Sequence, residues 1–169
     1  MTKLHIAILS YRSAPFGGGQ GVYVHDISKA LSMMGHKVDV ISGPPYPNLS
    51  DQVSLVKLPG LNLFQTFSFK DRLKIFWMKE NKSLSDIYEF ISVLLGGFPE
   101  MRTFGVRAKN FLEEKQYDVI IDNQSISYGM LDIQKKMPFI EIIHHPITKD
   151  FSHELEASSK FLYKLSRYR

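Results

Sequence analysis

The sequence predicts a doubly wound α/β fold, in which a parallel sheet carries helices on both faces. Three observations support this prediction. Short apolar runs alternate along the chain with segments of helical periodicity. A cluster of glycines directly follows the first apolar run. The order strand, glycine loop, helix, strand makes a βαβ unit, which implies parallel strands joined by a right-handed crossover.

The first βαβ unit occupies the N-terminal quarter of the chain. Residues 4–9 form a compact apolar run that predicts a buried strand, and residues 13–21 form a loop. A helix follows, with apolar residues at helical spacing as far as Met34, and Gly35 is expected to end it. Residues 37–41 then predict a second strand parallel to the first.

The remaining elements continue the alternation, with one interruption. We expect a domain over residues 3–150 with a helical insertion at about 61–98, because that stretch breaks the strand–helix rhythm. The further predicted elements are a strand at 53–58, one or two helices within 61–98, a helix at 100–115, a strand at 117–122, a helix at 128–136, a strand at 139–144 and a tail helix at 151–169.

Composition excludes several classes of protein. The 169 residues are 44% hydrophobic and 22% charged, as in an average soluble domain. The chain has no cysteine, which excludes disulfides and thiolate chemistry and fits a cytoplasmic protein. No secretory signal or membrane-spanning run is recognisable. The net charge of +4 favours anionic partners, but no dense basic block indicates nucleic acid.

The glycine loop has three functional interpretations. A nicotinamide or flavin site is disfavoured, because Val22 replaces the third glycine and the second strand ends without an acidic residue. A phosphate-binding P-loop is excluded by the missing Gly-Lys-Ser/Thr sequence. A donor-phosphate loop of a sugar transferase fits best, since Gly17, Gly18 and Gly19 let the backbone approach an anion before a helix. The structural alternative is a tight turn that needs only glycine conformations.

The same residues resemble a known family. Residues 14–24, Leu31 and residues 35–40 resemble the opening of family 4 glycosyltransferases, with their GG…G…V…L…L…GH.V.V pattern. Residues 117–124 and 142–148 are similar to later strand ends of that family. The resemblance implies the N-terminal, acceptor-side, Rossmann-like domain of a two-domain GT-B enzyme that retains anomeric configuration. It also implies a C-terminal donor-binding domain that these residues do not contain.

The resemblance also implies a site. Gly17, Gly18, Gly19 and Gln20 are expected to meet the phosphates of a nucleotide-sugar, which is a co-substrate, so that no cofactor is needed. The acceptor is expected to be a glycan or a lipid-linked sugar. Without its second domain, we expect this fragment to be inactive.

Polar residues at later strand ends complete the candidate site. His144 and His145 are the candidate catalytic residues, because an imidazole there would contact a sugar hydroxyl or steady negative charge. Asp122, Asn123 and Arg12 are candidates for substrate binding. The structural alternatives are capping for the histidines, Asp122 and Asn123, and a solvated side chain for Arg12.

No metal is expected. His144 and His145 are adjacent, so their side chains diverge on an extended backbone. His153-Glu154 begins like the H-E-x-x-H zinc motif, but the second histidine is missing.

Residues 61–98 mix aromatic side chains with lysines. This mixture suggests peripheral contact with an anionic membrane, as would suit a lipid-linked acceptor. The alternative is a helix that packs its aromatics inward and leaves its lysines in water. Two further functions stay open beside the transferase: a nucleotide- or sugar-phosphate-binding module without catalysis, and a flavodoxin-like or receiver-like domain. A receiver needs an acidic cluster after its first strand, and Ser10-Tyr11-Arg12 is not one.

Overall fold

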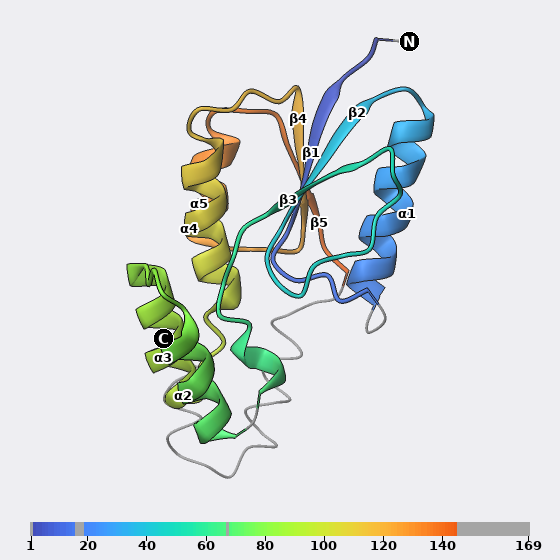
Figure 1. Ribbon diagram of the computed structural model, residues 1–169. Helices are drawn as coiled ribbons and strands as arrows, with labels where there is room; N and C mark the ends of the chain where they lie inside the picture. The colour runs from blue at the N-terminus through green and yellow to red at the C-terminus, as the bar shows by residue number, and fades with distance from the viewer. Residues whose placement is uncertain (1, 16–18, 67, 145–169) are drawn as a thin grey trace. The chain divides into compact units, whose positions relative to one another are not determined.

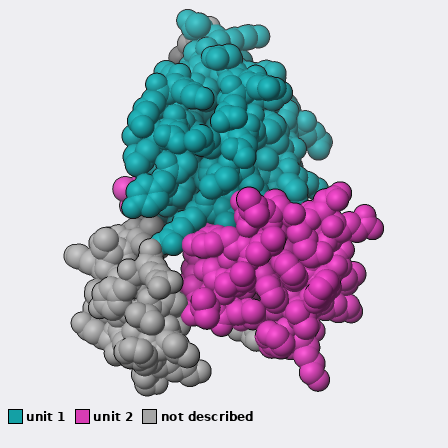
Figure 2. Space-filling view, turned by 90° about the vertical axis from the view of Figure 1, so that its left-hand side faces the viewer, with its two compact units in different colours: residues 1–60, 101–142 teal, residues 61–100, 143–169 magenta. Residues whose placement is uncertain are grey.

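The computed structural model describes residues 2–15, 19–66 and 68–144 (Figure 1). The chain divides into two compact units (Figure 2). The first unit comprises residues 1–60 with 101–142, and the second comprises residues 61–100 with 143–169. The expected tail helix at 151–169 lies outside the described residues.

The first unit is built on a five-stranded sheet in the order β3-β2-β1-β4-β5, and every pair of neighbours is parallel. The apolar runs of the sequence form these strands, because strands covered on both faces are apolar throughout. The strands are β1 His5–Ser10, β2 Lys37–Ser42, β3 Ser54–Lys57, β4 Val119–Asn123 and β5 Phe139–Ile142.

Helices cover both faces of this sheet, as the sequence predicted (Figure 1). One face packs Ile6 and Ile8 of β1 against Val24 of α1, which runs Gly19–Met33. The other face packs Ala7 and Leu9 against α4, Glu100–Leu112, and α5, Tyr128–Gln134. Because side chains alternate along a strand, one apolar run supplies both cores.

The last strand is shorter than the sequence suggested. The apolar run reaches His144, but β5 ends at Ile142. Its only neighbour in the described sheet is β4, and the last register pair joins Asn123 to Ile142. Beyond Asn123 the backbone of β4 turns, with Gln124 in the left-handed region at φ 56°. The strand therefore loses its hydrogen-bonding partner two residues before the apolar run ends.

The helix end predicted at Gly35 is confirmed. Gly35 has φ 92°, a conformation that costs a glycine little. Its N–H donates to the Ser32 carbonyl oxygen at 2.9 Å, and the His36 N–H donates to the Leu31 carbonyl oxygen at 3.2 Å. These two bonds are the pair that defines a Schellman motif, and they satisfy carbonyls that the end of α1 leaves free.

The second unit contains a short 3₁₀ turn, η1 Leu63–Gln65, and two helices, α2 Phe69–Met78 and α3 Leu84–Leu94. It has a small core of its own, in which Leu61, Leu63 and Val93 are buried and Phe76 stacks on Phe90 at 4.3 Å. Ser83 and Asp86 form a capping box at the start of α3. No helix within the described ranges is both long and apolar enough to cross a bilayer.

Two glycines bring α4 close to the start of α5 in the first unit. A β-carbon on Gly129 would lie 2.5 Å from the Gly105 carbonyl oxygen, and one on Gly105 would lie 2.0 Å from Ser127 Oγ. Real β-carbons do not approach backbone oxygens so closely. The glycines therefore set the spacing of these two helices on the sheet.

We predict that Gly129→Ala lowers the free energy of unfolding by about 1–3 kcal/mol, because the added methyl forces α4 and α5 apart. Gly19→Ala is the matched control near a helix start, since a β-carbon there meets nothing within 4 Å. Urea denaturation followed by circular dichroism measures both. Equal stabilities of the two variants would contradict the spacing role of Gly129.

A polar network fastens the amino-terminal half of the sheet. The Tyr117 hydroxyl donates to Asp39 Oδ2 at 3.0 Å, and His5 Nε2 lies 2.9 Å from the same oxygen. Burial alone would raise the pKa of Asp39, but the hydrogen bonds with His5 and Tyr117 outweigh it and lower that pKa. Burial, followed by the nearby Asp39 charge, raises the pKa of Tyr117. The network links β1, β2 and the chain entering β4.

Replacing Asp39 with asparagine is expected to reduce stability at neutral pH by about 1–3 kcal/mol, since a buried charged acceptor is lost. Because the pKa of Asp39 is lowered in the folded protein, its contribution exists above the unfolded pKa and disappears as pH falls through the lower folded value. The deficit of Asp39→Asn should therefore shrink at acidic pH below about 4. A deficit that is constant from pH 7 to pH 3 would refute this.

Candidate functional site

The carboxyl ends of β1 and β4 carry a buried polar network. Ser10, Ser13, Asn123 and Ser125 are at most 1% exposed. Ser10 Oγ and Ser13 Oγ lie 2.5 Å apart, and Asn123 Nδ2 donates to Ser10 Oγ at 3.4 Å. The Tyr11 N–H donates to Ser125 Oγ at 3.1 Å. This network ties the backbone that leaves β1 to the turn that follows β4.

The glycine loop runs from this network into α1. Gly17 and Gly18 lie outside the described residues, whereas Gly19 and Gln20 are the first two residues of α1. Gly19 is exposed, and the space where its β-carbon would stand is empty. The first-turn N–H groups of a 15-residue helix start here, and they attract an anion.

Gly21 has a different task, which the sequence did not distinguish. A β-carbon at Gly21 would lie 2.1 Å from the Ala14 carbonyl oxygen. Gly21 is buried, so it lets the segment leaving β1 pack directly on the first turn of α1. Gly21 thus allows close packing of the backbone, whereas Gly19 leaves open space.

Asp122 and Asn123 stand at the end of β4, as the sequence predicted, and both are fully buried. Asp122 Oδ2 accepts the Ser125 N–H at 2.7 Å, so this carboxylate caps the turn. Asn123 bonds to Ser10 as described above. The structure therefore shows these side chains in the structural tasks that were the alternative to substrate binding, and contact with a substrate stays a prediction.

Asp122 has a neighbour that sequence reasoning missed. Glu141 of β5 is its register partner, so the two carboxyl groups share one face of the sheet. Burial raises the pKa of Asp122. Partial burial, and then the charge of Asp122, raises the pKa of Glu141. The sequence contained one sign of this pair, because Glu141 is a charged residue within the apolar run of the last strand.

The remaining candidate residues are Arg12, His144 and His145. Arg12 is half-buried just beyond β1, and its guanidinium carbon lies 5.4 Å from the Tyr11 ring centroid. His144 is exposed, two residues beyond the end of β5, and belongs to the second unit. His145 lies outside the described residues. Within the described ranges, no three His, Asp or Glu side chains are grouped as a metal site would require.

Comparison with known proteins agrees with the resemblance to family 4 glycosyltransferases. The model of Glycosyltransferase Family 4 matches residues 17–169. A curated relative, the MMP alpha-(1->4)-mannosyltransferase of Mycolicibacterium hassiacum, is 41% identical over 159 residues. That match covers 92% of this chain but only 38% of the relative, so the chain spans well under half of the relative's length.

One solved structure supports the fold, and a second has a lower TM-score. The glycotransferase of kitacinnamycin gives a TM-score of 0.50 at 13% identity, covering 99% of this chain and 38% of that one. The calicheamicin glycosyltransferase CalG4 gives a TM-score of 0.47 at 15% identity, covering 98% of this chain and 41% of that one. The family match extends over most of the sequence, from Gly17 onward, and includes the glycine cluster and the carboxyl ends of β4 and β5. The chain therefore belongs to glycosyltransferase family 4.

Proposed function

We propose that the protein containing this chain transfers a sugar, most simply mannose, from a nucleotide-sugar to a hydroxyl group of a glycan or lipid-linked acceptor. The observation that carries the proposal is the glycine loop, which enters the N-terminus of α1 beside the carboxyl ends of β1 and β4. In open α/β sheets, ligands bind at the carboxyl ends of the strands. The 41% identical relative is a mannosyltransferase, which favours mannose as the sugar.

The loop has the chemistry for a diphosphate. Gly19 offers backbone without a side chain, and the start of α1 has no acidic residue in its first turn that would repel an anion. Free N–H groups and the positive end of the helix dipole favour a phosphate at this place. We assign Gly17, Gly18, Gly19 and Gln20 to the donor phosphates, where they stabilise the leaving diphosphate as the glycosidic bond breaks.

The polar network holds the segment of chain that leads from β1 toward the glycine cluster. Ser13 immediately precedes the loop region and is held by Ser10, which is held in turn by Asn123. We propose that Asp122 and Asn123 help to bind the acceptor at the carboxyl ends of the strands. We propose that Arg12 binds an anionic group of a substrate. His144 and His145 would contact the sugar or its acceptor hydroxyl. Catalysis here consists of orientation and charge stabilisation, with no metal or cofactor.

The name of the relative, an alpha-(1->4)-mannosyltransferase, favours retention of configuration. If the donor is an α-linked nucleotide-sugar such as GDP-mannose, an α-linked product means that the anomeric configuration is retained. We propose the same outcome here. The remainder of a protein of the relative's length has room for a second α/β domain, which would bind the nucleotide and select the donor. The 169-residue chain alone is then expected to be inactive.

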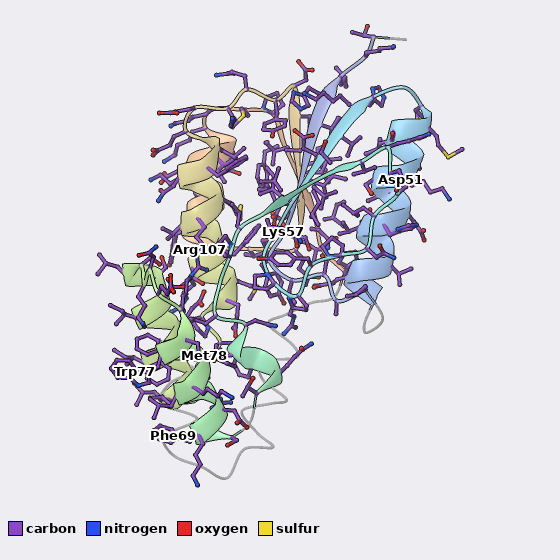
Figure 3. All side chains as sticks on the ribbon, in the orientation of Figure 1. Asp51, Lys57, Phe69, Trp77, Met78 and Arg107 are labelled. Carbon is purple, nitrogen blue, oxygen red and sulfur yellow. The ribbon has the colours of Figure 1, made fainter. Side chains whose placement is uncertain are left out.

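The second unit supports a membrane-associated acceptor. α2 has no buried residue, and Phe69, Trp77 and Met78 are 59%, 69% and 71% exposed (Figure 3). Lys70 and Lys74 are exposed on the same helix. Exposed aromatic residues among lysines match an anionic lipid surface, where the rings enter the interface and the ammonium groups meet headgroups.

The loop assignment is tested by Gly18→Val in the full-length protein. We expect kcat/KM with GDP-mannose to fall by roughly 100-fold or more, because the side chain blocks backbone contact with the diphosphate. The melting temperature should be unchanged, since the substitution acts on the ligand. Parallel assays with UDP-glucose in place of GDP-mannose show which donor the protein uses. A mannoside serves as the acceptor in both. Normal turnover by Gly18→Val would remove the loop from the site, while binding of intact donor without turnover by the wild type would establish a binding module.

Membrane contact can be followed through Trp77, because it is the single tryptophan of the chain. Its fluorescence should shift to the blue when vesicles containing phosphatidylglycerol are added, and remain unchanged with pure phosphatidylcholine vesicles. Lys70→Glu/Lys74→Glu should abolish the shift, and Lys3→Glu/Lys37→Glu is the control with the same change in charge. No shift with anionic vesicles would contradict membrane contact and favour a soluble glycan acceptor.

A further inference from the structure

Two carboxyl groups face each other across the last two strands of the first unit. Asp122 of β4 and Glu141 of β5 are register partners in a parallel pair, so their side chains leave the same face of the sheet. Asp122 is fully buried, whereas Glu141 is exposed at the edge. Two carboxyl groups directly opposite each other on neighbouring strands repel each other when both are ionised.

The buried carboxyl lacks one hydrogen bond. Asp122 Oδ2 accepts the Ser125 N–H at 2.7 Å, but no conventional donor among the described residues reaches Oδ1, whose surface is buried. A buried carboxylate oxygen without a donor is costly. The group beside it is the carboxyl of Glu141, its register partner on the same face of the sheet. Two carboxyl groups can be hydrogen-bonded only if one of them carries a proton.

We propose that Asp122 and Glu141 hold one proton between them and that this shared proton fastens the carboxyl end of β5 to β4, making Glu141 a positioning residue for the site. The Glu141 O–H donates to Asp122 Oδ1, and the pair carries a single negative charge. This bond matters because β5 is four residues long and has β4 as its only described neighbour. The chain passes from β5 to His144, so the functional part of the proposal rests on the proposed function.

Two lysines on or next to the helices of this face are engaged by Asp132. Asp132 lies in α5, Lys135 directly follows α5, and Lys109 lies in α4. Lys109 Nζ lies 2.8 Å from Asp132, and Lys135 Nζ lies 3.5 Å from it, so these three groups pair with one another. Ser125 supplies the polar contacts of Asp122. Burial raises the pKa of both carboxyl groups, and the Asp122 charge raises the pKa of Glu141 further, to about 8.

The raised pKa fixes the direction of the pH dependence. A carboxyl group whose pKa is higher in the folded protein stabilises it at low pH, and this contribution is lost as pH rises through the folded pKa. For Glu141 the loss begins as pH rises above the unfolded pKa of about 4 and is complete once pH has passed its folded pKa of about 8. Above that range two carboxylates face each other, and the end of β5 is expected to loosen.

The carboxyl ¹³C resonances of the wild-type chain test the proton directly. Glu141 should titrate between about pH 7 and pH 9. The melting temperature of the chain should fall by about 2–4 °C between about pH 5 and pH 8, as the unfolded carboxyl group ionises and the folded one does not. In Glu141→Gln the amide N–H donates to Asp122 Oδ1 at every pH, so this fall should vanish. Glu114→Gln, which changes an exposed carboxylate after α4, is the matched control and should behave like the wild type.

A Glu141 resonance that titrates below pH 6 would overturn the pair, as would parallel melting curves of wild type and Glu141→Gln across the pH range. In the full-length protein, kcat/KM for transfer should decline above pH 8 in the wild type and decline less in Glu141→Gln. Identical pH profiles would overturn the positioning role. If the full-length protein transfers no sugar at any pH, the proposed function fails, and the ¹³C titration of the wild type still decides the pair.

Discussion

The parallel pairing of β1 with both β2 and β4 is the constraint on which the rest of the first unit depends. β1 lies at the centre of the sheet, and its residues pair in register with β2 on one side and β4 on the other. Parallel pairing places the carboxyl ends of all three strands at one edge. The glycine loop follows β1, the polar turn follows β4, and these two segments are 113 residues apart in sequence where Ser10 meets Asn123.

The two edges of the sheet have different tasks. At the amino-terminal edge, Asp39 is satisfied by His5 and Tyr117, so its charge is stabilised and the strands are fixed in register. At the carboxyl edge, Asp122 is buried, and no conventional donor among the described residues reaches its Oδ1. Ligands of open α/β sheets usually bind at the carboxyl ends of the strands, where the candidate site lies.

The second unit is organised by different forces. Its core is small, and α2 contributes no buried residue. The capping box of α3 and the 2.6 Å ion pair between Lys79 and the buried Asp86 supply local order. Ile75 and Phe76 of α2 pack on this core, while Phe69, Trp77 and Met78 remain exposed and available to a partner surface. For this reason our proposal assigns the second unit to the membrane-associated acceptor and not to the donor.

The sequence alone determined the order of elements, the end of α1 at Gly35 and the family, because these depend on local spacing and on residues adjacent in the chain. Tertiary structure decided where β5 ends, since a strand stops when its neighbour turns away. It also decided that Gly19 and Gly21 have different roles, because only the packed backbone of Ala14 shows that Gly21 must lack a side chain. Glu141 came to notice in the same way: its partner Asp122 is 19 residues distant in sequence, and only the register of two strands brings the carboxyls together.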